Sequence, residues 1–147
     1  MYNIIRCMAK FISHSEKETI EYARALAADF RGGETVLLSG DLGAGKTVFA
    51  KGVALALGIT SPIKSPTFTI CCEYKGEKLL LRHFDAYRLA SGREGEAAGI
   101  NEYFGRTDGV CVIEWPEQIG SILPRRAIKI KITTVDENTK EIIRSDE

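Results

Sequence analysis

The sequence lacks the features that would place a chain in a membrane or build a zinc site. It contains no uninterrupted apolar run of about 18 residues, which a membrane-spanning helix needs, and its first residues do not have the layout of a signal peptide. It has 4 cysteines and 2 histidines but no pair of cysteines in C-x-x-C spacing, so a zinc site is not expected. We therefore expect reduced thiols in a cytoplasmic protein with no membrane association.

An excess of charge of one sign is also absent. The chain has 20 basic and 20 acidic residues, which gives a formal net charge of zero. Proteins that bind nucleic acid without help usually carry a surplus of basic residues. We therefore do not expect this chain to bind nucleic acid unaided.

Internal repeats, low-complexity tracts and linker-like segments are missing as well. The chain has 147 residues, 44% hydrophobic and 27% charged, which is the composition of an ordinary globular protein. A domain of this size buries about two-thirds of the surface that its unfolded chain exposes. We therefore predict a single domain that spans residues 1–147.

Residues 40–47 carry the most informative pattern in the chain. They read Gly40-Asp-Leu-Gly-Ala-Gly-Lys-Thr47 and match G-x-x-x-x-G-K-[ST], the phosphate-binding loop. The apolar run Thr35–Ser39 before them suits a buried strand, and Val48–Leu57 after them has the pattern of a helix that ends at Gly58. A strand, a glycine-rich loop and a helix in this order predict a protein that binds a nucleoside triphosphate.

The chemistry of phosphate binding explains these residue types. Glycines let the backbone adopt conformations closed to other residues, so that successive N–H groups can point at one phosphate. Lys46 supplies a mobile cation for the outer phosphates, and the Thr47 hydroxyl can bind Mg²⁺. The residues expected to contact the nucleotide are Gly40, Asp41, Leu42, Gly43, Ala44, Gly45, Lys46, Thr47 and Val48.

Hydrolysis would also require carboxylates at the ends of strands beside the loop. Asp85 follows an apolar strand that begins at Leu79, and Glu114 follows Val110–Ile113. These two residues are the candidates to hold Mg²⁺ and to orient the attacking water. Each has an alternative interpretation, because acidic residues often end strands. Asp85 could be a turn or capping residue, and Glu114 a solvated glutamate beside a buried Trp115.

Other polar residues have two interpretations each. Thr67 could reach the γ-phosphate or Mg²⁺ from a loop stiffened by Pro62 and Pro66, but spacing alone favours a capped turn before the next strand. His83 lies beside an apolar strand, where a lone histidine is more often packed than catalytic. Four arginines could stabilise transferred phosphate charge, although most arginines are simply solvated: Arg82, Arg88, Arg93 and Arg106.

The remaining patterns complete a mixed fold. Ser15 and Glu18 fit a capping box at the start of a helix that runs to about Arg31. The other predicted elements are a hairpin of Phe68–Tyr74 with Lys78–His83, a helix near Gly99–Phe104, a buried strand at Gly109–Ile113, and a hairpin of Ala127–Val135 with Glu141–Arg144. We predict an α/β three-layer sandwich of the P-loop NTPase type, with central parallel strands and antiparallel strands at its edges. These patterns do not predict the order of the strands.

With these residues in place, the chain resembles the bacterial TsaE (YjeE) ATPases, which support the threonylcarbamoyladenosine modification of tRNA. The resemblance spans nearly the whole chain and rests on four pieces in the family's order: Gly40–Thr47, Ser65-Pro-Thr-Phe68, His83-Phe-Asp-Ala-Tyr-Arg-Leu89 and Ile113-Glu-Trp-Pro116. The first piece is shared by many nucleotide-binding proteins, whereas the last three together are specific. Residues 92–98 depart from the family pattern, since Gly95 and Ala98 stand where the family has apolar residues, which weakens the expectation of a helix there.

The resemblance implies roles for individual residues. Lys46 and Thr47 would bind phosphate and Mg²⁺, and Asp85 would be the Walker-B-like carboxylate. Glu114 would help to hold Mg²⁺ and would position the attacking water.

The resemblance also implies that Trp115 lies close to the nucleotide and that Thr67 lies in a switch-like loop. Family members act with two partner proteins, TsaD and TsaB, and TsaD carries the transfer of threonylcarbamoyl to an adenosine of tRNA. TsaE-type ATPases use ATP with Mg²⁺ to keep that pair turning over. ATP hydrolysis would then be weak alone and stimulated by the partners, and tRNA would be contacted mainly indirectly, through the complex.

A small-molecule kinase that acts independently is the main alternative, because such enzymes share the loop and a similar length. A kinase would need an acceptor pocket and an arginine-bearing lid, for which residues 92–108, with Arg93 and Arg106, are the only suitable stretch. A GTPase is disfavoured because the chain has no N-K-x-D motif, and an ABC-type ATPase because it has no L-S-G-G-Q-like signature. A binding module that hydrolyses ATP negligibly alone would differ from a TsaE-type ATPase only in its dependence on partners.

Overall fold

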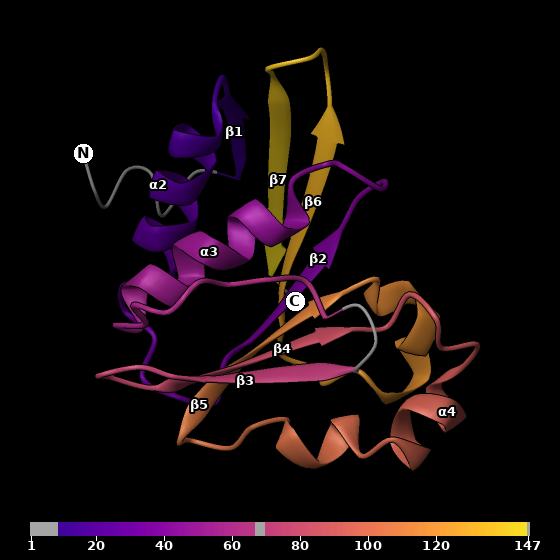
Figure 1. The fold of residues 1–147 in the computed structure, drawn as a ribbon. Helices are drawn as coiled ribbons and strands as arrows, with labels where there is room; N and C mark the ends of the chain where they lie inside the picture. The colour runs from indigo at the N-terminus through magenta and orange to yellow at the C-terminus, as the bar shows by residue number, and fades with distance from the viewer. Residues whose placement is uncertain (1–8, 67–69, 147) are drawn as a thin grey trace.

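The computed structural model of the chain describes residues 9–66 and 70–146, and its centre is a mixed β-sheet (Figure 1). Within these residues the strand order is β1-β7-β6-β2-β5-β4-β3. The strands are β1 Lys10–Ser13, β2 Thr35–Ser39, β3 Cys71–Lys75, β4 Leu80–Asp85, β5 Gly109–Glu114, β6 Ile128–Thr134 and β7 Lys140–Asp146. The pairs β6–β2, β2–β5 and β5–β4 are parallel, whereas β1–β7, β7–β6 and β3–β4 are antiparallel. The predicted central parallel strands with antiparallel edges are thereby confirmed.

Two helices cover one face of the sheet, α2 (Glu16–Ala27) and α3 (Lys46–Ala56) (Figure 1). The helix α2 begins as predicted, because the Ser15 hydroxyl accepts the N–H of Glu18 at 3.1 Å. The Glu18 carboxylate accepts the N–H of His14 at 2.9 Å, one residue before the position that a standard capping box uses. The core on this face includes Tyr22, Leu26, Val36, Leu38, Phe49, Val53, Val112 and Ile130.

The opposite face is covered by shorter elements, which completes the three predicted layers. These are α4 (Gly92–Ala97) and two 3₁₀ helices, η1 (Ile100–Tyr103) and η2 (Pro116–Ile122). The core on this face includes Leu37, Phe84, Leu89, Ile100, Cys111, Ile113 and Ile119. Elements on both faces of the sheet therefore pack against its central strands. Among these strands, β2 leads to the phosphate-binding loop, and β4 and β5 end at the two candidate carboxylates.

The placement of one predicted helix is wrong. The α-helix of this region spans Gly92–Ala97, and residues 100–103 form only a 3₁₀ turn, whereas the sequence predicted a helix near 99–104. The helix lacks apolar periodicity because Gly95 packs directly against η2. A Cβ at Gly95 would lie 2.9 Å from Cγ2 of Ile119, so the partner element supplies the apolar side chain at this contact.

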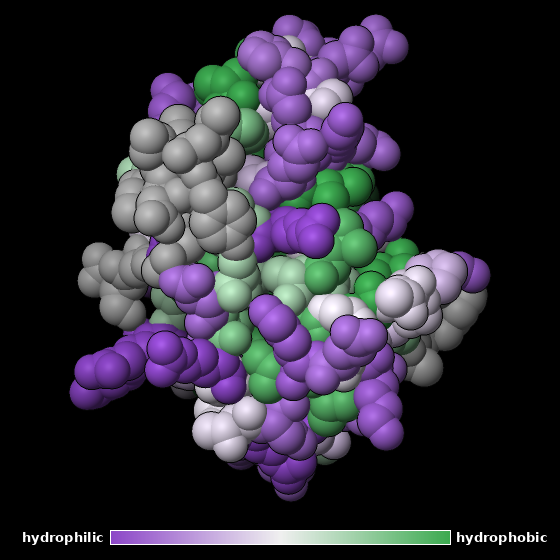
Figure 2. Space-filling model, turned by 90° about the vertical axis from the view of Figure 1, so that its left-hand side faces the viewer, coloured by the Kyte–Doolittle hydropathy of each residue, from purple (hydrophilic) through white to green (hydrophobic). Residues whose placement is uncertain are grey.

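Within the described residues, no helix combines the length and the apolar character that crossing a bilayer would require. Figure 2 shows the side of the molecule that lies on the left in Figure 1. Hydrophobic residues gather in the middle of this view, and hydrophilic residues project around them.

Three cysteines lie in the described part of the chain, and none of them forms a disulfide there: Cys71, Cys72 and Cys111. Burial raises the pKa of Cys111 to about 12 and that of Cys71 to about 11. Thiols with such pKa values stay protonated at neutral pH and are poor nucleophiles. Cys7 lies outside the described residues.

Candidate functional site

The predicted phosphate-binding loop connects the end of β2 to the first turn of α3. Its glycines have positive φ angles of 154° at Gly40, 77° at Gly43 and 106° at Gly45. A Cβ on Gly43 or Gly45 would meet no atom within 4 Å, so backbone conformation rather than space requires glycine at these two positions. The helix α3 begins at Lys46, so its free N–H groups and the positive end of its dipole lie at the loop, as an anion site requires.

Lys46 is folded back onto this loop. Its Nζ donates hydrogen bonds to the carbonyl oxygens of Gly40 and of Asp41, the second at 3.1 Å, and lies 4.0 Å from the ring centroid of Trp115. The residue is only 5% exposed. Burial lowers the pKa of Lys46, and nearby carboxylates, Glu114 above all, oppose this effect. The ammonium is thus held at the loop by contacts that a phosphate group can replace.

The two candidate carboxylates meet at the tips of neighbouring strands. Asp85 ends β4 and Glu114 ends β5, and the two residues are register partners. Glu114 is also the register partner of Leu38 on β2. Its Oε2 lies 3.4 Å from Oγ1 of Thr47, a long hydrogen bond. The structure therefore brings the predicted hydroxyl and both predicted carboxylates together beside the loop.

Asp85 combines this position with a turn. Its Oδ1 accepts the N–H of Tyr87 at 2.9 Å, which is the turn role that the sequence left open. Burial raises the pKa of Asp85; the N–H of Tyr87 opposes the rise, and the negative charge of Glu114 adds to it. The turn role of Asp85 is therefore confirmed, whereas its role in holding Mg²⁺ stays a prediction.

Trp115 follows Glu114 in a left-handed conformation, with φ 58° and ψ 48°. It is the only residue other than glycine with positive φ within residues 9–66 and 70–146. Such a conformation costs about 1–3 kcal/mol in a bulky residue and persists only where the surroundings enforce it. Here the Trp115 ring contacts the Lys46 ammonium and the Tyr87 ring, and the centroids of the two rings are 4.9 Å apart.

These side chains line a cleft of about 350 Å³, together with Thr47, Val48 and Ser65. In the described ranges, no group of three or more His, Cys, Asp and Glu side chains could hold a metal ion by itself. Beside the loop, the cleft offers the Thr47 hydroxyl and the carboxylates of Asp85 and Glu114. Oxygen donors of this number fit Mg²⁺, which usually takes one or two carboxylates and completes its shell with phosphate oxygens and water.

A second cleft, of about 440 Å³, adjoins the first and shares Gly43, Gly45 and Val48 with it. Its other wall comes from the start of α2 and from the β6–β7 hairpin, including Asn138. Lys140 belongs to that hairpin, and its Nζ donates to the carbonyl of Gly43 at 3.3 Å. No local pattern indicates this wall, because Lys140 is 97 residues away from Gly43 in the chain.

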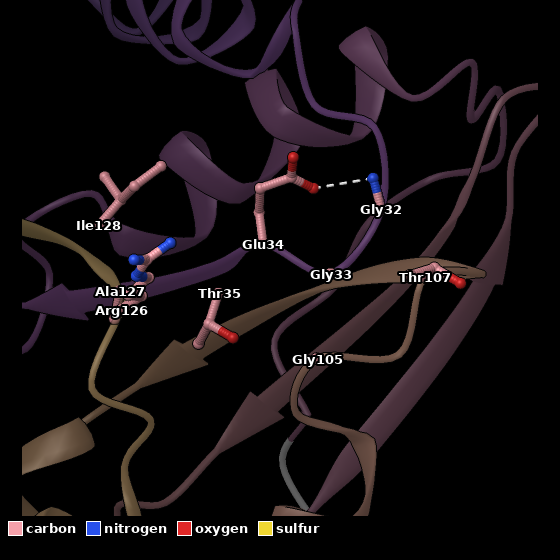
Figure 3. Close-up of a pocket in the computed structure, with 9 residues that line it drawn as sticks. All are labelled: Gly32, Gly33, Glu34, Thr35, Gly105, Thr107, Arg126, Ala127 and Ile128. Atoms are coloured by element: carbon pink, nitrogen blue, oxygen red, sulfur yellow. Dashed lines mark hydrogen bonds between the residues drawn. The ribbon is translucent and has the colours of Figure 1, made fainter.

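The largest of these three hollows, about 510 Å³, lies at the opposite end of the parallel strands, where β2 and β6 begin (Figure 3). Gly32, Gly33 and Gly105 bring backbone close to it, and Arg126 lies at its wall. The Glu34 carboxylate there already accepts the N–H groups of Gly32 and Arg31, both at 2.9 Å. This cavity shares no lining residue with the cleft that contains Lys46, Asp85 and Glu114.

The structure removes one candidate arginine from the site. Arg82 forms ion pairs with Glu73 and Asp108, both at 2.9 Å, and its guanidinium lies 4.9 Å from the ring centroid of Tyr103. Arg106 stacks on the same ring at 4.9 Å. The hydrogen bonds of Arg82 with Asp108 and Glu73 raise its pKa. These contacts hold the Arg82 guanidinium on the face of the sheet opposite α3.

Thr67 lies outside the described residues, so its predicted role stays a prediction. His83, which sequence reasoning left undecided, is fully buried, and its Nε2 lies 2.6 Å from Oε2 of Glu114. The pairing could not be read from the sequence, because it joins residues 31 positions apart through the β4–β5 register.

Known proteins resemble this chain over most of its length. A family model described as "Threonylcarbamoyl adenosine biosynthesis protein TsaE" matches residues 13–142. A tRNA threonylcarbamoyladenosine biosynthesis protein TsaE of Bacillus subtilis (strain 168) is 42% identical over 133 residues, which cover 90% of this chain and 82% of the relative. One of the same name from Treponema pallidum (strain Nichols) is 41% identical over 131 residues, covering 89% of this chain and 96% of the relative.

A solved structure agrees with these sequence matches. The crystal structure of YdiB from Bacillus subtilis superposes with a TM-score of 0.79 at 37% sequence identity. The match covers 93% of this chain and 84% of that one.

Proposed function

The chain belongs to the TsaE family of threonylcarbamoyl adenosine biosynthesis proteins, and on that premise we propose that it is an Mg²⁺-dependent ATPase of the tRNA modification machinery. It would bind ATP at the loop and hydrolyse it to support turnover of the partners TsaD and TsaB in the cytoplasm. One observation carries the proposal: Lys46, Thr47, Asp85 and Glu114 line a single cleft.

Nucleotide binding would begin with the loop. The N–H groups at the start of α3 and the Lys46 ammonium would receive the β- and γ-phosphates, with Lys46 exchanging the carbonyls of Gly40 and Asp41 for phosphate oxygens. The exchange conserves the number of hydrogen bonds and places the lysine charge on an anion. When bound, Mg²⁺ would neutralise charge on the phosphates, and Thr47, Asp85 and Glu114 are the residues to hold it, directly or through water.

Hydrolysis would depend on Glu114. Its carboxylate stands at the tip of β5 and lines the cleft beside Thr47, where it can accept a hydrogen bond from an attacking water. Asp85 would add a second acceptor from β4. Lys46 would stabilise the charge that develops as the γ-phosphate leaves.

The adenine base would occupy the second cleft. Because the two clefts share Gly43, Gly45 and Val48, one elongated ligand can have its phosphates in the first and its base in the second. Asn138 offers both a hydrogen-bond donor and an acceptor there, as recognition of a purine edge needs. Asn138→Ala should then raise the KM for ATP and leave kcat unchanged.

The geometry weighs against an independent kinase. The segment that would serve as its lid, residues 92–108, packs through α4 on η2, and η2 lies on the face of the sheet opposite α3. Arg106 of that segment is engaged with Tyr103. Neither feature places an arginine-bearing lid over the cleft.

Phosphate release from ATP by the purified chain, alone and with TsaB and TsaD, tests the proposal. We expect slow release alone, stimulation by the pair, and loss of both in Lys46→Ala. Lys51→Ala is the matched control, because Lys51 is exposed on the same helix. Rates that ignore the pair would contradict the role in supporting TsaD and TsaB.

A further inference from the structure

His83 is a fully buried titratable residue beside Glu114 that the proposed reaction leaves without a task. It is 0% exposed and lies on β4 two residues before Asp85, so both side chains point to the face that carries α3. Its register partner on β5 is Val112, two residues before Glu114. His83 and Glu114 are therefore diagonal neighbours across two parallel strands.

The contact between them is short and has a defined direction. His83 Nε2 lies 2.6 Å from Glu114 Oε2, and an ionised carboxylate can only accept, so the imidazole donates through Nε2–H. The hydroxyl of Thr47 reaches the same oxygen at 3.4 Å. Because both contacts use Oε2, Oε1 is the oxygen with lone pairs to spare for water or a metal ion.

The other ring nitrogen has no such partner. Nδ1 of His83 is buried without a hydrogen bond to any of the described residues. A ring retained only for packing would be replaceable by an apolar side chain that leaves no polar atom unsatisfied. The bond that Nε2 makes to Glu114 is what this histidine contributes.

We propose that His83 is a positioning residue that fixes the Glu114 carboxylate at the tip of β5, with Oε1 directed to the reacting water. This inference rests on the proposed ATP hydrolysis and deepens it. Glu114 is itself only 4% exposed, so without the imidazole its carboxylate would lose a buried donor and its fixed orientation. The reaction geometry would then loosen while the phosphate-binding loop stayed intact.

Two substitutions separate positioning from packing. His83→Leu removes the donor and keeps an apolar side chain of similar bulk, whereas His83→Gln keeps an N–H near the place of Nε2–H. We expect His83→Leu to lower kcat by roughly 10- to 100-fold, with the dissociation constant for ATP within about twofold of wild type. His83→Gln should recover most of the loss. Equal activity of the two variants, or wild-type activity of His83→Leu, would overturn the proposal.

A double-mutant comparison tests whether the effect passes through Glu114. In a Glu114→Gln background, His83→Leu should cause little further loss of kcat, because the oriented carboxylate is already gone. Losses that multiply would show that His83 acts independently and would overturn the proposal.

A readout without hydrolysis keeps this inference distinct from the proposed function. ¹⁵N NMR of the imidazole in the wild-type protein should show a slowly exchanging proton on Nε2, and Glu114→Ala should make that proton exchange faster. A ring protonated on Nδ1 instead would overturn the inference, even in an active enzyme. A wild-type chain that hydrolyses no ATP, even with TsaB and TsaD, would contradict the proposed function while this spectrum still decides the contact.

Discussion

The two ends of the parallel strands differ in what they leave available to a ligand. At the amino end, the cavity of about 510 Å³ is the larger, yet its carboxylate, Glu34, is already held by two backbone N–H groups. At the carboxyl end, the cleft of about 350 Å³ contains Lys46, Asp85 and Glu114 in one group. Ionisable side chains thus converge in the smaller hollow, at the strand tips, so volume alone is a poor guide to a functional site.

The glycines of the two ends differ in the same way. At the carboxyl end, a Cβ on Gly43 would meet open space, so only the φ angle of 77° requires glycine. At the amino end, a Cβ on Gly32 would lie 2.0 Å from the carbonyl oxygen of Thr107. Backbone conformation alone therefore requires glycine at position 43, whereas conformation and close backbone packing both require it at position 32.

Removing a cation from each end should give the largest contrast. Lys46→Ala should lower ATP turnover by at least roughly 100-fold, because the phosphates lose their positioned charge. Arg126→Ala should change turnover by less than about twofold, since Arg126 lies at the opposite edge of the sheet. Phosphate release in the presence of TsaB and TsaD measures both. A large loss of ATP turnover in Arg126→Ala would show that the amino end of the strands also contributes to the reaction.

Removing a negative charge from each end should give the next contrast. Glu114→Gln should retain ATP binding and lose about 100-fold in kcat, because the attacking water is no longer oriented by a carboxylate. Glu34→Gln should leave kcat unchanged and lower the thermal midpoint, since it weakens the bonds to Arg31 and Gly32. Steady-state kinetics measure kcat, and thermal unfolding measures the midpoint, for each variant. A normal turnover rate in Glu114→Gln would refute the assignment of that residue.

The glycines offer a third contrast, in stability. Gly32→Ala should destabilise the fold by about 2 kcal/mol or more, because a positive φ of 107° and a backbone contact both oppose a side chain. Gly43→Ala should cost about 1 kcal/mol, from its backbone conformation alone. Urea unfolding gives both values. Equal free energies of unfolding for the two variants would remove the distinction between them.

The smallest effect concerns the pH dependence that Asp85 introduces. Its folded pKa is raised above 3.8, so between pH 3.8 and the raised pKa the native state binds more protons than the unfolded state. Its contribution to the free energy of unfolding therefore falls as pH rises through that window, and Asp85→Asn removes the fall. In metal-free buffer the midpoint difference, Asp85→Asn minus wild type, should grow from about pH 4 upwards and then level off. A constant difference across the range would show that Asp85 is not destabilised by burial.

Much of the carboxyl end could be predicted from sequence because its signals are local. The strand Thr35–Ser39 has the predicted bounds, and the helix after the loop begins only two residues before the predicted start. The position of Asp85 and Glu114 at strand tips also followed from where two apolar runs stop. Local pattern sufficed in these cases because each feature is fixed by neighbours in the chain.

The features that sequence reasoning missed depend on contacts between distant segments. The helix at Gly92–Ala97 has no apolar stripe, because Gly95 lies against Ile119 of another element. The bond between His83 and Glu114 needs the β4–β5 register, and the strand order itself had no local signal. The left-handed backbone of Trp115 is likewise enforced by its surroundings, so no propensity could indicate it.

β2 is the middle strand of the sheet, yet both of its partners are made late on the ribosome. Val36 pairs with Val112 on one side and with Ile128 on the other. At roughly 5–20 residues per second, the loop emerges several seconds before either partner strand has been synthesised. During that interval Lys46 has neither Glu114 beside it nor Trp115 over it, so a nascent chain cannot present the assembled cleft. The cleft is therefore a property of the completed chain and of no N-terminal part of it.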